Sequence, residues 1–136
     1  NAEGIAWLEK AASYESPEAF YRIGVLFREG FAVEKDLVSA RYWFEKAAAK
    51  GYLLAYFPTA ELYASDPAGI VIDNPDAKIL AKTYLWLSAS EQRLEEGQEL
   101  LLVKEWLRKA RLVIPNTWYI DLDAKVQAHM QTIDAS

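Results

Sequence analysis

A six-residue phrase occurs twice in this sequence, and the interval between its copies limits the fold more than any other feature. Residues 7–12 read WLEKAA and residues 43–48 read WFEKAA, so five of six positions are identical at an interval of 36 residues. Intervals of roughly 20–50 residues are typical of stacked repeat units, each of which buries its apolar side against a neighbour. The sequence therefore predicts a repeat protein that presents a surface rather than a catalytic pocket.

Helical spacing and capping residues divide the chain into helices. Ser16 followed by Pro17 is typical of a helix start and Gly30 of a helix end, which predicts a helix over residues 17–29. Asp36 and Gly51 bound the next predicted helix in the same way. The remaining helices are predicted over residues 3–13, 53–64, 75–90 and 95–113, and from Asp121 or Asp123 to Thr132.

Two prolines affect these boundaries. Asn74 and Pro75 are predicted to cap and open the helix over residues 75–90. Pro58 falls inside the predicted helix over residues 53–64, where proline removes a backbone donor. Either that helix begins near Phe57 or it kinks at the proline.

Composition argues against several classes of protein. The chain has a net charge of −5 and no cysteine, so it lacks the basic surface that nucleic acids and anionic membranes require, and it has no cysteine-based metal site. No apolar run reaches the roughly 18–20 residues of a membrane-spanning helix. Hydrophobic residues make up 52% of the 136 positions, enough for the core of one domain over residues 1–136. We expect neither a nucleic-acid partner nor membrane insertion.

The small and aromatic residues of one repeat unit follow a regular spacing, which begins with Ala19, Tyr21 and Ile23 and ends with Ala55. This spacing resembles the Sel1-like repeat, a relative of the tetratricopeptide repeats. The resemblance implies an all-α fold, a short right-handed α-α solenoid of Sel1/TPR-like helix-turn-helix repeats with a C-terminal capping helical element. The structural signature that it implies consists of Gly24, Phe27, Gly30, Asp36, Ala40, Trp43, Ala47, Ala48 and Gly51.

The same resemblance implies the organisation of the chain and its binding residues. Residues 3–13 correspond to the second helix of a partial repeat, 17–51 to a full repeat, 53–90 to a divergent repeat and 91–136 to the cap. In tetratricopeptide-like geometry the first helix of each unit lines a concave groove. The partner-binding residues implied in this way are Glu18, Tyr21, Val25, Arg28, Glu29, Phe57 and Glu61. The alternative is that these side chains only contact the adjacent helix.

Few residues suggest other chemistry, and we predict no catalytic residue, cofactor or metal. His129 is the only histidine, and a surface or half-buried structural residue is the favoured interpretation. Capping and turn formation are favoured over a calcium site for Asp66, Asp73, Asn74 and Asp76, because the spacing of an EF-hand is missing. The acids Glu91, Glu95, Glu96 and Glu99 form a run near the start of the helix over residues 95–113. We favour solvated side chains near a helix N-terminus over an acidic surface that recognises a partner.

These observations predict a non-enzymatic module that binds a protein or peptide in its groove. The resemblance implies an adaptor, scaffold or inhibitor, often bacterial and exported. A periplasmic immunity protein that neutralises a secreted effector is one form of this. One alternative is an envelope-glycan-binding or hydrolytic protein built on the same solenoid, and another is a homodimer formed through the N-terminal helix. Because the sequence opens inside a repeat and without Met, we expect further residues before Asn1, including any export signal.

Overall fold

The computed structural model describes residues 2–135, and the side chains of Ala2 and Ile5 lie outside the described part. Within this range the elements are seven α-helices and two short 3₁₀ helices, with no strand. This confirms the predicted all-α fold. The chain divides into two compact units, Asn1–Thr59 and Ala60–Ser136. The organisation into one domain with a divergent repeat and a cap stays a prediction.

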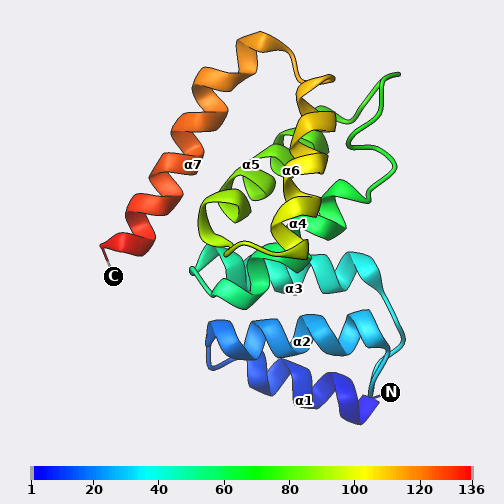
Figure 1. Cartoon of the computed structure of the whole chain (residues 1–136). Coiled ribbons are helices and arrows are strands. Elements are labelled where there is room, and N and C mark those ends of the chain that lie inside the picture. The colour runs from blue at the N-terminus through cyan, green and yellow to red at the C-terminus, as the bar shows by residue number, and fades with distance from the viewer. Residues whose placement is uncertain (1, 136) are drawn as a thin grey trace. The chain divides into compact units, whose positions relative to one another are not determined.

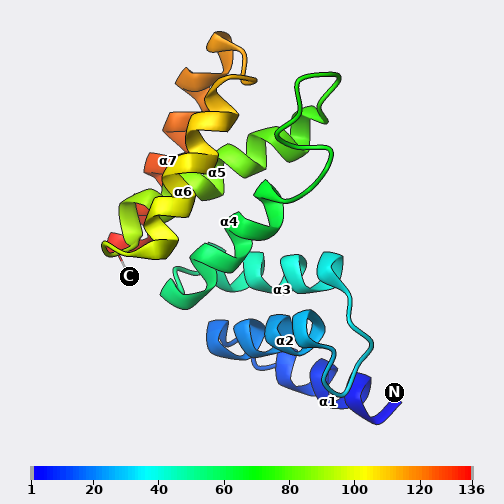
Figure 2. The ribbon, with the colours of Figure 1, turned by 45° about the vertical axis from the view of Figure 1, so that its right-hand side comes forward.

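The first unit is built from three helices that lie side by side in chain order, as Figures 1 and 2 show. They are α1 (Ala2–Ala12), α2 (Pro17–Glu29) and α3 (Leu37–Ala49), and the 3₁₀ helix η1 (Leu53–Ala55) follows them. The side chain of Ser16 accepts a hydrogen bond from the Ala19 amide, and Gly30 ends α2 in the left-handed conformation with φ of 78°. The predicted boundaries of α2 are therefore confirmed.

The core of the first unit combines side chains from α1, α2 and the loop before α3. Leu8, Ile23 and Val33 are buried together. Side chains packed around them are Ala11, Ala12, Leu26, Phe27 and Trp43. Burying one such aliphatic side chain contributes about 1.5–3 kcal/mol, so this cluster is a main source of the unit's stability.

The second unit contains three long helices after α4 (Tyr56–Ala64), which begins in the first unit. These helices are α5 (Ala77–Arg93), α6 (Gln98–Arg111) and α7 (Tyr119–Asp134), and the 3₁₀ helix η2 (Asn116–Trp118) leads into α7. Both α6 and α7 pack against α5. Buried aliphatic side chains on α5 and α6 form the centre of the unit: Leu80, Leu87, Val103 and Leu107.

Three predicted helix starts are wrong by a few residues. One is the start of α6, which begins at Gln98 rather than at residue 95, with Gly97 before it and no side-chain cap. Asp76, not Asn74, caps α5, because its carboxylate accepts a hydrogen bond from the Ile79 amide at 3.0 Å. Asn74 instead adopts the left-handed conformation with φ of 52° inside the loop that precedes α5. The last helix begins at Tyr119 rather than at Asp121 or Asp123, because η2 continues directly into α7 and no side-chain cap is present.

The position of Pro58 is explained by where α4 begins. The helix begins at Tyr56, so the proline occupies the first turn. Backbone N–H groups in the first turn of a helix have no partner within the helix, and the donor that proline lacks is therefore not missed there. This settles the alternatives for this segment in favour of a start near Phe57.

Candidate functional site

The predicted binding residues of α2 share one side of that helix. Their spacing of three, four and seven residues places Glu18, Tyr21, Val25, Arg28 and Glu29 along one stripe. Both acids are exposed, whereas the other three side chains are half-buried. The spacing of these residues alone accounts for this grouping, because positions three and four apart are neighbours on a helix.

Part of this α2 stripe packs against the first unit itself. The ring of Tyr21 lies 5.6 Å from the ring of Phe44 and 5.5 Å from that of Tyr52, measured between centroids. The guanidinium of Arg28 lies 5.2 Å above the Phe44 ring and 3.1 Å from a carboxylate oxygen of Glu29. Tyr21 and Arg28 therefore have fixed positions while each keeps part of its side chain open to solvent.

The other two predicted binding residues lie one turn apart on α4. Phe57 and Glu61 are both half-buried. Phe57 belongs to the first unit and Glu61 to the second. Their part in a groove stays a prediction.

The signature residues adopt conformations and contacts that suit a helical repeat. Gly30 and Gly51 have φ of 78° and 87°, which side chains other than glycine rarely adopt. Asp36 caps α3 by accepting from the amides of Val38 and Ser39. Gly24 contacts the ring of the buried Phe44. Three further signature residues, Ala40, Ala47 and Ala48, are fully buried, and two aromatic ones, Phe27 and Trp43, are half-buried.

Sequence reasoning missed a cluster in which three aromatic rings surround a lysine. The ammonium of Lys46 lies 4.9 Å from the centroid of Phe20 and 5.5 Å from those of Tyr42 and Trp43. The sequence could have indicated two of these contacts. Tyr42 and Trp43 precede Lys46 by four and three residues, so they lie on the same side of a helix as Lys46. Phe20 comes from α2, and no local pattern could have placed it there.

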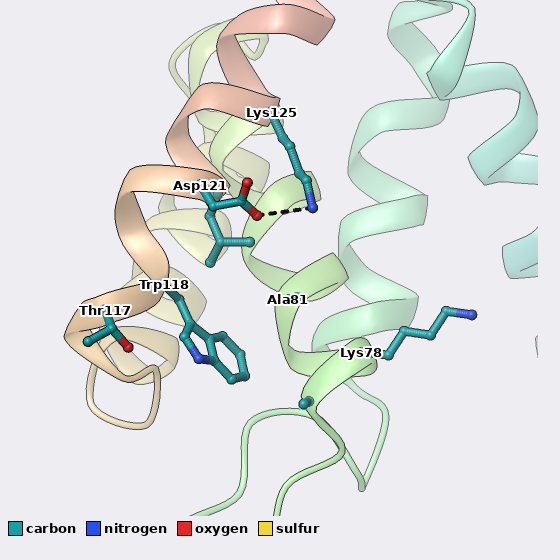
Figure 3. Close-up of a pocket in the computed structure, with 8 residues that line it drawn as sticks. Lys78, Ala81, Thr117, Trp118, Asp121 and Lys125 are labelled. Atoms are coloured by element: carbon teal, nitrogen blue, oxygen red, sulfur yellow. Dashed lines mark ion pairs between the residues drawn. The ribbon is translucent and has the colours of Figure 1, made fainter.

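A shallow cleft of about 420 Å³ opens in the second unit between the first turns of α5 and α7. Figure 3 shows the indole of Trp118, the last residue of η2, reaching toward α5, with the side chain of Lys78 directed away from it. Lys125 Nζ lies 3.1 Å from a carboxylate oxygen of Asp121, and both side chains are mostly exposed. The remaining lining residues are Ala77, Ala81, Thr117 and Leu122.

Ionisable groups of the second unit serve to fix α7 on α5. The hydroxyl of Tyr84 donates a hydrogen bond of 2.6 Å to Asp123, and burial raises the pKa of this tyrosine. The ring of His129 meets Trp86 edge-on at 5.3 Å, and burial lowers the pKa of the imidazole. This agrees with the interpretation of His129 as a half-buried structural residue.

The acidic positions considered for calcium or acidic recognition are dispersed. Asp66 accepts a hydrogen bond from the Ala68 amide in a turn, and Asp76 caps α5. Of the acidic run, Glu99 lies in the first turn of α6 as expected, but Glu91 is half-buried in the last turn of α5, so the interpretation as a solvated acid near the start of the sixth helix is wrong for Glu91. Across residues 2–135, no group of three acidic, histidine or cysteine side chains is arranged to hold a metal ion. In the same range no helix is both long and apolar enough to span a membrane.

Comparison with known proteins identifies the repeats. The family model of the Sel1 repeat matches residues 1–13 and 17–52. No curated protein and no solved structure shows significant similarity to the chain. The matched residues include α1, α2 and α3, together with the caps and small residues that bring α2 and α3 into contact. Sel1 repeats generally mediate contacts between proteins and are generally not catalytic. Residues 1–13 and 17–52 of this chain are therefore identified as Sel1 repeats.

Proposed function

We propose that this protein is a non-enzymatic binding module that holds a protein or peptide partner against the α2 stripe, the surface formed by Glu18, Tyr21, Val25, Arg28 and Glu29. The observation that carries the proposal is the position of Tyr21 and Arg28. Both side chains pack on Phe44 and yet remain partly open to solvent. A tyrosine and an arginine with fixed positions lose little conformational freedom when a partner binds, and both are enriched at the centres of protein interfaces.

Charge supports a partner that is at least partly cationic. Glu18 and Glu29 are exposed at the two ends of the stripe, and the chain carries a net charge of −5. Each acid pairs with an arginine of α2 in a solvent-exposed salt bridge. Exposed pairs contribute about 0.2–1 kcal/mol, so a cationic partner can replace Arg22 beside Glu18 at small cost. A cationic effector that this protein inhibits would bind to this surface. The partner of an adaptor or scaffold would bind to the same surface.

The alternative of a hydrolytic or glycan-binding protein has weaker support. Glycoside hydrolysis requires two carboxyl groups that face each other across the substrate. The cleft of the second unit is lined by one carboxylate, Asp121, which pairs with Lys125. This arrangement favours the binding module over the hydrolase.

Affinity capture of partners from the source cell tests the proposal. We expect the wild-type chain to retain a partner that the Tyr21→Ala/Arg28→Ala double variant loses. Because Tyr21 also packs on Phe44, Glu18→Lys/Glu29→Lys provides a second variant that changes only exposed side chains. A matched control is Tyr14→Ala/Arg108→Ala, which removes an exposed tyrosine and an exposed arginine elsewhere. If both α2 variants retain every partner at wild-type strength, the α2 stripe is not the binding surface.

A further inference from the structure

The lysine surrounded by aromatic rings on α3 carries a charge that the protein leaves without a carboxylate. Lys46 lies within 5.5 Å of three ring centroids, those of Phe20, Tyr42 and Trp43. The rings also contact each other, with Phe20 and Trp43 5.8 Å apart and Tyr42 and Trp43 5.1 Å apart. Aromatic faces attract a cation within about 6 Å and hold it in place without neutralising it.

Nothing else in the described part of the chain compensates this charge. Lys46 forms no salt bridge there, and it is half-buried. The positions three and four residues away on the helix are Tyr42, Trp43, Ala49 and Lys50, none of which is acidic. Lys50 adds a second exposed positive charge one turn further along. Lys46 and Lys50 therefore place two cations near this end of α3, where Glu45 is the neighbouring acid in the sequence, on a chain whose net charge is −5.

Exposed apolar side chains continue this surface along α3. Tyr42 is 54% exposed and Val38 is 71% exposed, although both are large hydrophobic residues. Val38, Tyr42 and Lys46 follow one another at intervals of four residues and form one line along the helix, which we call the α3 strip. An aliphatic, an aromatic and a cationic side chain in one line provide both the apolar area and the charge that a partner segment needs.

We propose that the α3 strip binds an acidic segment of a partner protein, in which a carboxylate pairs with Lys46 and a neighbouring apolar side chain covers Tyr42 and Val38. This proposal rests on the proposed role as a protein-binding module but not on the α2 stripe. Three rings within cation–π distance favour this position of the ammonium, so a partner has less side-chain freedom to remove than at a fully exposed lysine. The partly desolvated surroundings also strengthen the attraction between the two charges.

The internal repeat provides a matched control. Lys10 occupies the position of Lys46 in the first copy of the repeated phrase, and Trp7 occupies that of Trp43. Ala6 stands where Tyr42 stands, however, so the tyrosine ring is missing. Lys10 is exposed. If binding depends on the cluster of rings, replacing Lys46 should weaken it and replacing Lys10 should not.

Fluorescence anisotropy with the full chain and a labelled synthetic peptide of alternating Glu and Leu tests the proposal. We expect the wild type to bind this peptide, more weakly at high salt, and not to bind the peptide with Lys in place of Glu. Lys46→Met and Tyr42→Ala should each weaken binding about tenfold, as for residues at the centre of an interface. Lys46→Arg should bind like the wild type, because it keeps the cation over the rings. Lys10→Met should also bind like the wild type.

Three outcomes would overturn the proposal: no binding by the wild type, undiminished binding by Lys46→Met, or equal loss in Lys10→Met and Lys46→Met. Circular dichroism of each variant distinguishes lost contacts from lost folding, and retained binding by Lys46→Arg does so independently. The Tyr21→Ala/Arg28→Ala variant should bind the peptide normally. Its loss of a cellular partner therefore reports on the α2 stripe alone, and failure of one proposal is separable from failure of the other.

Discussion

The ring of Phe44 lies directly against the backbone of Gly24, where a Cβ atom would be 2.6 Å from Phe44 Cδ1 and 3.0 Å from its Cγ. Phe44 is fully buried. Its ring has no free space to enter, because protein interiors are close-packed. This contact fixes how closely α2 and α3 approach each other, and the neighbouring contacts of Tyr21 and Arg28 with Phe44 depend on it.

Replacing the glycine should separate these two helices. We expect Gly24→Ala to lower the free energy of unfolding by about 1–3 kcal/mol, the usual cost of overpacking a core, even though alanine favours helix formation. Urea denaturation measures the change. The double variant Gly24→Ala/Phe44→Leu should recover part of the loss, because leucine has no ring to meet the new methyl group. A Gly24→Ala protein as stable as the wild type would contradict the contact.

The hydrogen bond from Tyr84 to Asp123 should contribute to the attachment of α7. We expect Tyr84→Phe to lower the free energy of unfolding by about 1–2 kcal/mol, because the bond is to a charged acceptor but that acceptor remains exposed to water. Tyr119→Phe is the matched control, since Tyr119 packs on Tyr84 without a hydrogen bond from its hydroxyl in the described residues. Equal effects of the two variants in urea denaturation would show that the hydroxyl of Tyr84 adds nothing.

Stability of the second unit should decrease in mild acid because of His129. Burial, and secondarily the charge of Arg93, lowers the pKa of this histidine below its usual value of 6.5. The unfolded chain therefore binds a proton at higher pH than the folded chain does. The contribution of neutral His129 is fully present above about pH 6.5 and is lost as the pH falls through the lowered pKa of the folded state. Melting temperatures measured across this range should decrease for the wild type.

The chain has a single histidine, so the variant His129→Gln provides a direct control for this prediction. Glutamine has no ionisable group, and its melting temperature should vary less over the same range. If the wild type and the variant respond identically to acid, His129 is not the group that titrates.

The cap of α3 should also respond to pH, but in stronger acid. Hydrogen bonds from Ser39 lower the pKa of Asp36 below its usual value of 3.8, and the amide of Val38 adds to the effect. The folded state then favours the carboxylate. Its contribution is present above about pH 3.8 and is lost as the pH falls through the lowered pKa. The protection factors of the amides in the first turn of α3, which compare each exchange rate with the intrinsic rate at the same pH, should therefore fall in acid for the wild type, whereas those of Asp36→Asn should change little.

Local signals predicted the elements of the first unit well. Ser16 and Asp36 each bind amides two or three residues ahead, so the short segment around each residue contains everything that the cap needs. The start of α5 was harder to predict, because Asn74 and Asp76 are both capping residues and only the φ of 52° at Asn74 excludes the first of them. The start of α7 was missed because a 3₁₀ turn, not a side chain, leads into it.

Contacts between distant segments could not be predicted in this way. Tyr84 and Asp123 are separated by 39 residues, and nothing near either residue indicates the other. The cluster around Lys46 needs Phe20 from a different helix. The α2 stripe could be predicted from spacing alone, but the extent to which Tyr21 and Arg28 pack on Phe44 depends on the distance that Gly24 allows between α2 and α3.

The two copies of the repeated phrase show which properties depend on the local sequence and which depend on tertiary packing. The sequence by itself determined that residues 7–12 and 43–48 are helical and that each copy places a tryptophan at the same position, because helix formation and capping depend on near neighbours. The tertiary structure decided what surrounds each ring. Trp7 is 57% exposed, whereas Trp43 is half-buried, with the ring of Phe20 5.8 Å away on α2. Burial depends on which helix packs against a residue, and two nearly identical phrases therefore have different surroundings.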